Sequence, residues 1–323
     1  MSSWDMIDSN ITISILMPAY NAAEYIREAI DSILNQTFTN FEFVIINDGS
    51  TDATEEIILS YSDERIQYYA NECNIGIVKT LNRGIDLCRG KYIARMDADD
   101  VSLPNRLEKQ VRCLETNPHI VACGVLYAIY GDQQQTLVDV ATDMLDVRYD
   151  MAIYCQFAHS MVMMRKDVLN TNQLQYREEY KYAEDYKLWT ELLQFGEMIN
   201  IPDVLGYIRQ CEEGISISNA ERQRNLSDRV RKEYLNQLGV KTQLLLSDVL
   251  NEESISSEVI RETLCAYYPL VLQAKSYNWL FQNYKTALKK YLRYLPLTKK
   301  IKEISYYWKG VLNIKDKLAI LLK

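Results

Sequence analysis

Short apolar segments of β-rich composition alternate with segments of helical periodicity from Thr12 to Tyr130, and this alternation limits the fold more than any other feature. The first two strands are expected at Thr12–Met17 and Phe41–Ile46. Between them, Ala22–Asn35 places apolar residues at helical spacing. Strands separated by helices pair in parallel through right-handed crossovers, and ligands gather at the carboxyl ends of such strands. We therefore expect an α/β fold with a mostly parallel sheet.

The alternation continues along the chain and then gives way to helices. Further elements are expected at Asp52–Tyr61 (helix), Ile66–Tyr69 (strand), Ile77–Cys88 (helix), Tyr92–Met96 (strand), Pro104–Asn117 (helix), Ile120–Tyr130 (strand), Ser160–Met164 (strand), Glu184–Phe195 (helix) and Ile201–Arg209 (strand). From about Glu221 onward only helical patterns remain. The sequence thus predicts an α/β domain over residues 1–219 and a helical C-terminal region over 220–323.

Composition excludes several classes of protein. Hydrophobic residues make up 48% and charged residues 25% of the chain, which is ordinary for a globular protein and excludes disorder for most of it. No apolar stretch approaches the ~20 residues that a membrane-spanning helix needs. The first ten residues carry acids and no basic segment, so no secretory signal is expected and the cytoplasm is the expected location. The seven cysteines form no CxxC pair and are expected to be reduced, mostly buried thiols.

Charge is distributed unevenly, because the region from Lys275 to Lys323 holds 12 Lys or Arg against two acids. Since the net charge is −8, the preceding part of the chain is strongly acidic, which argues against nucleic-acid binding. Aromatic and basic residues alternate in this tail: Trp279, Phe281, Tyr284, Tyr291, Tyr294, Tyr306, Tyr307 and Trp308 with Lys285, Lys289, Lys290, Arg293, Lys299, Lys300, Lys302 and Lys309. Such a tail suits peripheral contact with an anionic membrane. The alternative is that the aromatics pack the helices onto the protein or a second subunit.

Two polar clusters follow predicted strands. In Met96–Asp100, three carboxylates fall within four residues, and carboxylates at a strand end can converge on a hard divalent cation. In Asn47–Asp52, an aspartate fixed after a strand can accept a hydrogen bond from a nucleobase, while the glycine permits close backbone approach. Each cluster alone is also typical of a solvated or helix-capping turn.

The order of the motifs resembles the family 2 glycosyltransferases. The matching segments are MPAYN at 17–21, NDGSTD at 47–52, NxGxxxxLNxG at 74–84, GKYIARMDADD at 90–100, PNRLEKQ at 104–110, HSMVMMR at 159–165, AEDYKLW at 183–189 and GISIS at 214–218. They cover about two thirds of the chain in the order and spacing of that family. The resemblance implies a nucleotide-sugar-binding GT-A fold, a UDP-sugar donor and Mn²⁺ or Mg²⁺. A tail that meets a membrane would bring the site to its acceptor, which we expect to be a glycan or lipid-linked glycan.

The resemblance also implies roles for individual residues. Pro18, Ala19 and Tyr20 would line the pocket for the donor nucleotide. Asp48 would recognise its uracil. Asp97 and Asp99 would form the DxD element that holds donor and metal, with Asp99 in direct metal contact and Asp100 as a second ligand. Asp185 would be the catalytic base of an inverting transfer. His159 and Glu184 would lie at the acceptor, with Glu184 also competing for the base role.

Sugar transfer from a nucleotide donor requires the same groups, independently of the resemblance. A departing nucleoside diphosphate accumulates charge that a metal stabilises, and an opposed carboxylate must take the proton of the acceptor hydroxyl. Arg209 could pair with the diphosphate, since a guanidinium suits phosphate oxygens, although a surface role is nearly as plausible. The sequence departs from many relatives at Cys211, where a histidine would supply a metal or phosphate contact. Cysteine is a poor ligand for Mg²⁺ or Mn²⁺.

The sequence argues against three other functions. A sugar nucleotidyltransferase needs a Gly-rich loop after the first strand, and the loop at 18–23 has no glycine. A dehydrogenase would show GxGxxG there. A non-catalytic sugar-binding or scaffold protein is expected to lose the metal carboxylates or the base, which are present here. The QxxRW element and membrane helices of processive synthases are missing from the sequence. Transfer of a single hexosyl or N-acetylhexosaminyl unit is therefore the interpretation that the sequence favours.

Overall fold

A computed structural model describes residues 11–130, 135–209, 219–242, 244–251, 255–273, 279–293, 295–296, 299–300 and 303. The chain divides into two compact units. Unit 1 comprises residues 1–142 and 157–226, and unit 2 comprises residues 143–156 and 227–323. The sequence led us to expect one boundary after Asn219, and it did not predict that the segment 143–156 groups with the C-terminal helices.

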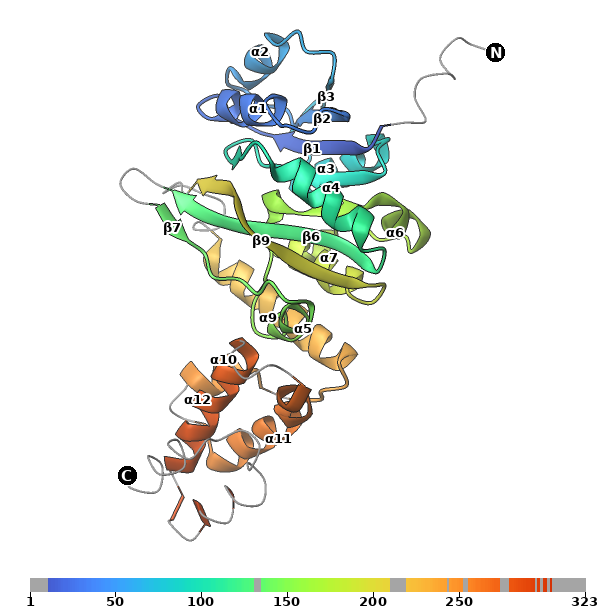
Figure 1. The fold of residues 1–323 in the computed structure, drawn as a ribbon. Helices are drawn as coiled ribbons and strands as arrows, with labels where there is room; N and C mark the ends of the chain where they lie inside the picture. The colour runs from blue at the N-terminus through green and yellow to red at the C-terminus, as the bar shows by residue number, and fades with distance from the viewer. Residues whose placement is uncertain are drawn as a thin grey trace. The chain divides into compact units, whose positions relative to one another are not determined.

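Unit 1 contains the sheet and most of its helices (Figure 1). Its strands are β1 (Ile13–Ala19), β2 (Phe41–Asn47), β3 (Ile66–Ala70), β4 (Tyr92–Arg95), β5 (Val101–Ser102), β6 (Ile120–Tyr130), β7 (Gln135–Leu137), β8 (Met163–Arg165) and β9 (Glu197–Arg209). Its helices are α1 (Ile26–Leu34), α2 (Thr54–Leu59), α3 (Ile77–Leu87), α4 (Arg106–Thr116), α6 (Lys166–Thr171) and α7 (Glu184–Leu192), with single 3₁₀ turns at His159–Met161 (η1) and Glu178–Tyr180 (η2).

The nine strands form one mixed sheet in the order β3-β2-β1-β4-β8-β6-β9-β5, with β7 beside β6. The strands β3, β2, β1 and β4 run parallel, as the alternation of strands and helices predicts. Strand β8 is antiparallel to both β4 and β6, and it joins the first parallel group to the parallel pair of β6 and β9. Most paired residues lie in parallel ladders, so the expected α/β fold with a mostly parallel sheet is confirmed.

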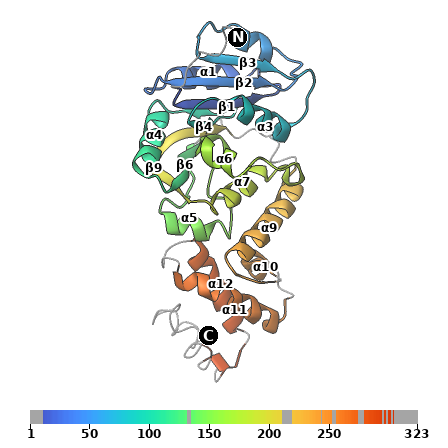
Figure 2. The same cartoon turned by 90° about the vertical axis from the view of Figure 1, so that its right-hand side faces the viewer.

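The core of unit 1 forms where helices cover the sheet. All seven residues of β1 and of β2 are buried, which explains why the two strands are apolar apart from Ser14, Glu42 and Asn47. Helix α3 packs on β1 and β2, and helix α4 packs on β6 and β9 (Figures 1 and 2). A Cβ on Gly84 of α3 would lie 2.2 Å from Leu16 Cδ1, so the glycine permits this helix to approach the sheet closely.

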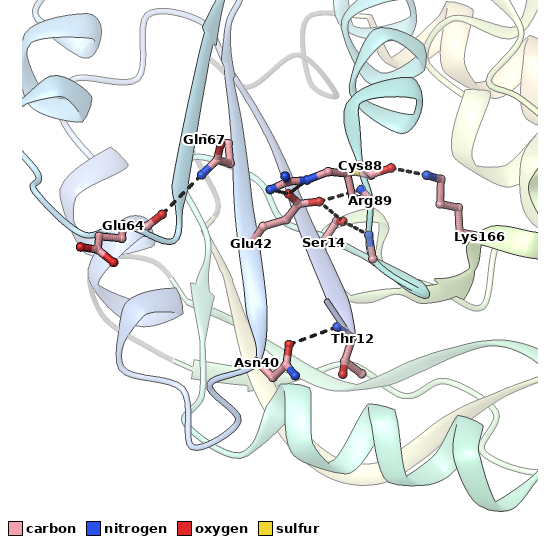
Figure 3. Close-up of polar contacts among 10 residues, drawn as sticks. Thr12, Ser14, Asn40, Glu42, Glu64, Gln67, Cys88, Arg89 and Lys166 are labelled. Carbon is pink, nitrogen blue, oxygen red and sulfur yellow. Dashed lines mark hydrogen bonds and ion pairs between the residues drawn. The ribbon is translucent and has the colours of Figure 1, made fainter. Parts of the chain in front are cut away.

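A hydrogen-bond network ties the amino ends of β1, β2 and β4 together (Figure 3). The buried carboxylate of Glu42 accepts hydrogen bonds from Ser14 Oγ at 2.6 Å, from the backbone N–H of Arg89 at 2.6 Å and from Arg89 Nε at 2.7 Å. The backbone N–H of Gly90 donates to Ser14 Oγ at 2.7 Å. Because β1 runs from this network toward the opposite edge of the sheet, the network fixes the strands without touching the carboxyl ends.

Unit 2 is helical in its described residues. It contains α5 (Met144–Asp150), most of α9 (Ala220–Gln237), α10 (Leu246–Asn251), α11 (Ser257–Gln273) and α12 (Trp279–Arg293). Helix α12 contacts α5, α10 and α11. The carboxylate of Asp150 accepts hydrogen bonds from the first two backbone N–H groups of α12, at 3.1 and 2.7 Å. Asp150 therefore caps α12, which explains why the segment 143–156 belongs to this unit.

The tail aromatics that the structure describes mostly pack inside unit 2. Tyr284 and Tyr291 are buried, Phe281 is half-buried and Trp279 is 42% exposed. Lys290 Nζ donates to the carbonyls of Val249 and Leu250 at the end of α10. Tyr294 and residues 304–323 lie outside the described residues. Within the described ranges, no helix has the length and apolarity needed to cross a bilayer.

The cysteines differ from expectation in their burial. All six described cysteines are free thiols, but only Cys88 and Cys123 among them are buried, while Cys73 and Cys265 are exposed. The expectation of mostly buried thiols is therefore wrong. The reason is local: Cys73 lies in the loop that follows β3, and Cys265 lies on an outer position of α11.

Candidate active site

The candidate site is built on the loops that follow β1, β2 and β4. Residues Ala19 and Asn47, which end β1 and β2, pair directly with each other. The backbone N–H of Asp48 donates to the carbonyl of Ala19 at 2.8 Å, and Asn21 Oδ1 accepts from the backbone N–H of Thr51 at 2.9 Å. The two loops are thus held together at the carboxyl edge of the sheet, where ligands of α/β folds bind.

Asp48 is buried and already has several hydrogen-bond partners. Its Oδ1 accepts from Asn71 Nδ2 at 2.7 Å and from the backbone N–H of Ile75 at 3.0 Å, and its Oδ2 accepts from the backbone N–H of Gly76 at 3.0 Å. A carboxylate has about four acceptor positions, so one remains on Oδ2. Asp48 therefore fixes the loop at 75–76 and retains the capacity for one further donor.

The three aspartates after β4 have different surroundings. Asp97 forms an ion pair with Arg95, with 2.6 Å between Arg95 Nη2 and Asp97 Oδ1. Asp100 is buried and accepts from the backbone N–H of Arg209 at 3.0 Å and from the hydroxyl of Ser160. Within the described residues, the carboxylate of Asp99 accepts a hydrogen bond from no residue but itself. Asp99 is thus the member of the cluster whose oxygens are most available to a ligand.

Crowding of these carboxylates shifts their proton affinity. Burial, followed by the charge of Asp97, raises the pKa of Asp99 to about 6. Burial and the charges of Asp97 and Asp99 raise the pKa of Asp100 to about 8. Both shifts arise because three negative charges share a poorly solvated region. A divalent cation would relieve that repulsion.

The donor set suits a hard cation. Carboxylate oxygens are the ligands that Mg²⁺ and Mn²⁺ prefer. Among the described residues, no three His, Cys, Asp or Glu side chains gather into a complete metal cage. A magnesium-type site needs no such cage, since it commonly uses one or two carboxylates together with substrate phosphates and water. Asp99 and its neighbours fit that kind of site.

Arg209 lies beside this cluster at the end of β9. Its Nε donates to the backbone carbonyl of Asp99 at 3.1 Å, and its Nη2 donates to Glu28 Oε2 at 2.5 Å and to the hydroxyl of Tyr130. The guanidinium carbon lies 4.4 Å from the ring centre of Tyr25 and 4.6 Å from that of Tyr130. These contacts hold Arg209 against the aspartate loop.

Helix α7 begins with the acidic pair Glu184 and Asp185. Glu184 is buried, and its Oε2 accepts from the backbone N–H of Tyr182 at 2.5 Å. Tyr182 has φ of 86°, an unusual conformation for a residue with a side chain. Asp185 is half-buried. The two side chains thus have different surroundings, as expected for adjacent residues of a helix, and only the Glu184 carboxylate is bound by the preceding turn.

Burial also raises the pKa values of this pair. The pKa of Asp185 is raised to about 7 by burial and then by the charge of Glu184. Burial raises the pKa of Glu184 as well. A carboxylate that titrates near neutrality matches the requirement for a general base that works near pH 7.

The other expected site residues fall at different depths. Pro18 and Ala19 are buried within β1, whereas Tyr20 is 49% exposed at its end. His159 is half-buried, and its Nε2 lies 3.3 Å from Arg95 Nε and 2.9 Å from Tyr176 Oη. Cys211 and the GISIS segment lie outside the described residues.

Sequence reasoning missed Arg95. This residue is almost completely buried, and its charge acts on Asp97, Asp99 and Asp185. An arginine inside an apolar run is unusual, because a buried charge needs partners. Its place directly before the aspartates was the signal that could have identified it.

Comparison with known proteins identifies the family of this chain. The profile of Glycosyl transferase family 2 matches residues 14–171. An uncharacterized glycosyltransferase of Haemophilus influenzae is 35% identical over 278 residues, which are 79% of this chain and 85% of that protein. The chain belongs to glycosyltransferase family 2. It is also 29% identical to the amylovoran biosynthesis glycosyltransferase AmsE of Erwinia amylovora, over 61% of this chain and 75% of AmsE.

Solved structures share the fold. Staphylococcus aureus TarS (residues 1–349), crystallised with UDP-GlcNAc, has a TM-score of 0.56 and 19% identity, over 96% of this chain and 90% of that chain. The mannosyltransferase PcManGT of Pyrobaculum calidifontis, in complex with GDP-Man and Mn²⁺, has a TM-score of 0.51 and 17% identity, over 96% and 84%. The GT-A fold expected from the sequence is confirmed, and the protein is a glycosyltransferase.

Proposed function

We propose that this glycosyltransferase moves a single sugar from a UDP-sugar to an acceptor hydroxyl, with inversion at the anomeric carbon and with a divalent metal. The observation that carries the proposal is that the buried Arg95 pairs with Asp97 at 2.6 Å and donates to His159, whose ring packs on α7, the helix that begins with the two other carboxylates. The positive charge of Arg95 acts on both the Asp97–Asp100 cluster and the Glu184–Asp185 pair. We assign the leaving group to the aspartate cluster and the base to the acidic pair of α7.

The donor end of the site is assigned to the loops after β1, β2 and β4. The free acceptor position on Asp48 Oδ2 suits the N–H of uracil, and the exposed ring of Tyr20 suits contact with the nucleotide. Asp99, with support from Asp97 and Asp100, would hold Mn²⁺ or Mg²⁺, which supplies positive charge for the departing diphosphate. Arg209 would add a second positive charge beside the diphosphate, because its Nε already donates to the backbone carbonyl of Asp99.

The base is assigned to Asp185. Glu184 is engaged by the N–H of Tyr182, whereas Asp185 is partly exposed and has a pKa raised to about 7. In its ionised form Asp185 would accept the proton of the acceptor hydroxyl as that oxygen attacks the sugar. Attack from the side opposite the leaving group inverts the anomeric centre. Glu184 would support the acceptor end.

Two other functions remain weaker. A sugar nucleotidyltransferase would hold a triphosphate on a Gly-rich loop after the first strand. In this chain, the loop after β1 is instead bound to the loop after β2 by the hydrogen bond between Asn21 and Thr51. A non-catalytic sugar-binding protein would have no need for a base carboxylate with a raised pKa, because desolvating it costs stability. Release of UDP rather than pyrophosphate separates transfer from nucleotidyl chemistry.

A donor panel tests the proposal. UDP-glucose, UDP-galactose, UDP-GlcNAc, UDP-GalNAc and GDP-mannose are each incubated with the full chain and Mn²⁺, with and without candidate acceptor glycans, and nucleoside diphosphate release is measured. We expect release from a UDP-sugar that EDTA abolishes. Preference for GDP-mannose would contradict the UDP assignment, and equal turnover in EDTA would contradict the metal. The winning donor also decides between hexosyl and N-acetylhexosaminyl transfer.

We further propose that the C-terminal region contacts an anionic membrane peripherally and brings the site to a lipid-linked glycan. Support comes from its strongly basic composition and from the exposure of Trp279. Burial of Tyr284 and Tyr291 and the capping role of Lys290 assign those three residues to packing. Any membrane contact would then depend on Trp279 and on the basic residues beyond α12.

A further inference from the structure

The geometry points to Arg95, held by His159 and Tyr176, as a positioning residue that fixes the carboxylate of Asp97 for the metal and the donor diphosphate. This inference rests on the proposed function, because it assigns Asp97 to the metal-dependent donor site. It gives His159 a role different from the acceptor contact that the sequence suggested.

The side chain of Arg95 reaches from the end of β4 into the protein and ends on Asp97. It is 2% exposed, whereas that of Asp97 is 35% exposed. Arg95 Nη2 lies 2.6 Å from Asp97 Oδ1, and Nη1 donates to the carbonyl of Met96. The cation is therefore fixed, and the carboxylate that it holds is the end of the pair that faces outward.

His159 holds the other side of this guanidinium. Arg95 Nε donates to His159 Nε2 at 3.3 Å. A guanidinium has no acceptor atom, so His159 Nε2 must carry a lone pair and the ring proton must be on Nδ1. Burial, followed by the nearby charge of Arg95, holds the pKa of His159 well below its usual range, which agrees with a neutral ring. A histidine in this state acts here as an acceptor for arginine.

Tyr176 completes the support and anchors it to α3, while His159 itself contacts α7. Its Oη lies 2.9 Å from His159 Nε2, and with that nitrogen as acceptor the hydroxyl is a donor that shares the single lone pair with Arg95 Nε and orients the imidazole ring. The backbone of Tyr176 is fixed by Asn82 of α3, with two hydrogen bonds of 2.9 Å in opposite directions. The ring of His159 packs edge-on against Trp189 of α7, with 6.1 Å between ring centres. The support thus spans α3, η1, α7 and β4.

This arrangement explains how a cluster of acids can be kept ready for a metal. Without Arg95, Asp97 would lose its ion pair and would repel Asp99 and Asp100 more strongly, with Arg209 still beside Asp99 on the other side of the cluster. A mobile cation would instead fold over the aspartates and compete with the metal. By directing Arg95 to a single oxygen of Asp97, the support leaves the other oxygen and the whole of Asp99 to a ligand.

Substitutions at His159 separate positioning from direct contact with the acceptor. His159→Gln can place an amide oxygen near the position of Nε2 and keep an acceptor for Arg95, whereas His159→Leu removes it. Tyr176→Phe keeps the ring and removes only the hydroxyl. Mn²⁺-dependent binding of UDP is measured by calorimetry for these three variants and the unmodified chain, together with melting temperatures and the KM for acceptor.

We expect His159→Leu to weaken Mn²⁺-dependent UDP binding about ten- to hundredfold, as loss of a hydrogen bond to a charged group predicts. His159→Gln should retain most of the affinity, and Tyr176→Phe should fall between the two. Unchanged affinity in His159→Leu would overturn the inference. So would a His159→Gln variant as impaired as His159→Leu with the defect confined to the acceptor KM, because that pattern indicates direct acceptor contact.

Three further outcomes are distinguishable. If His159→Leu does not fold, unchanged UDP affinity in the folded Tyr176→Phe variant overturns the inference by itself. If the unmodified chain does not bind UDP in the presence of Mn²⁺, the proposed function fails and this inference fails with it. Normal binding by the unmodified chain with unaffected variants rejects only the positioning role.

Discussion

At the scale of single residues, the raised pKa of Asp185 predicts the pH dependence of transfer. The base must be ionised, and burial with the charge of Glu184 raises its pKa to about 7. We expect kcat/KM to fall about tenfold for each pH unit below that value and to level off above it. Glu184→Gln removes the neighbouring charge, so it should move the acidic limb to lower pH. A limb that stays in place or moves upward in this variant would contradict the assignment.

The same crowding of charge predicts how Asp99 behaves. Asp99→Ala should abolish Mn²⁺-dependent UDP binding, because the diphosphate would then face acidic residues without a bridging cation. Binding by the unmodified chain should weaken as pH falls through about 6, where protons compete for Asp99. Calorimetry measures both effects. Asp203→Ala, which removes an exposed aspartate paired with Lys109, is the matched control and should bind normally. Unchanged affinity in Asp99→Ala would contradict the assignment.

The positions of the candidate site residues on strands and helices were predictable where the motifs are local. Asp48, Asp97, Asp99 and Asp185 stand at strand ends or at a helix start, and their neighbours in sequence place them there. The environment of His159 was not predictable, because its partners Arg95 and Tyr176 come from distant segments and only tertiary packing brings them to one nitrogen. The unused acceptor position on Asp48 could not be foreseen for the same reason.

At the scale of elements, the network at the amino ends of the strands should govern stability without affecting the site. Glu42→Gln keeps the shape of the side chain but removes the charge that binds Arg89 and Ser14 (Figure 3). We expect the free energy of unfolding to fall by about 2 kcal/mol, which urea denaturation measures. UDP affinity should be unchanged, because β1 separates the network from the site. A large loss of affinity with unchanged stability would contradict this view.

Elements with strong periodicity were predicted well, and short ones were not. Apart from β5, the strands and helices up to Tyr130 follow from alternation and helical spacing. Strand β5 has two residues and β7 has three, too few for any periodic signal. Strand β9 begins at Glu197 rather than at Ile201, because pairing with β6 extends it through polar positions. Helix α5 was missed because its burial depends on α12, which comes more than a hundred residues later.

At the scale of the whole molecule, membrane attachment is tested by flotation with phosphatidylglycerol vesicles at low salt. Truncation near Tyr268 would cut α11 and remove α12 from its packing, so charge reversal is the better design. We expect the full chain to float and a Lys299→Glu, Lys302→Glu, Lys309→Glu variant to remain in solution, since each cation near an anionic surface contributes about 1 kcal/mol. Lys232→Glu, Lys241→Glu, at exposed positions, is the control. Equal behaviour of the full chain and both variants would contradict membrane contact by the tail.

The central claim is that one carboxylate takes the acceptor proton while a separate group binds the donor. Asp185→Asn tests it most directly, with UDP affinity and the rate of transfer measured on the same preparation in Mn²⁺. We predict a loss of transfer of at least ~10²- to 10⁴-fold with UDP affinity nearly unchanged, and a much smaller loss in the matched Glu184→Gln variant. Near-normal transfer by Asp185→Asn together with a large loss in Glu184→Gln would contradict the account.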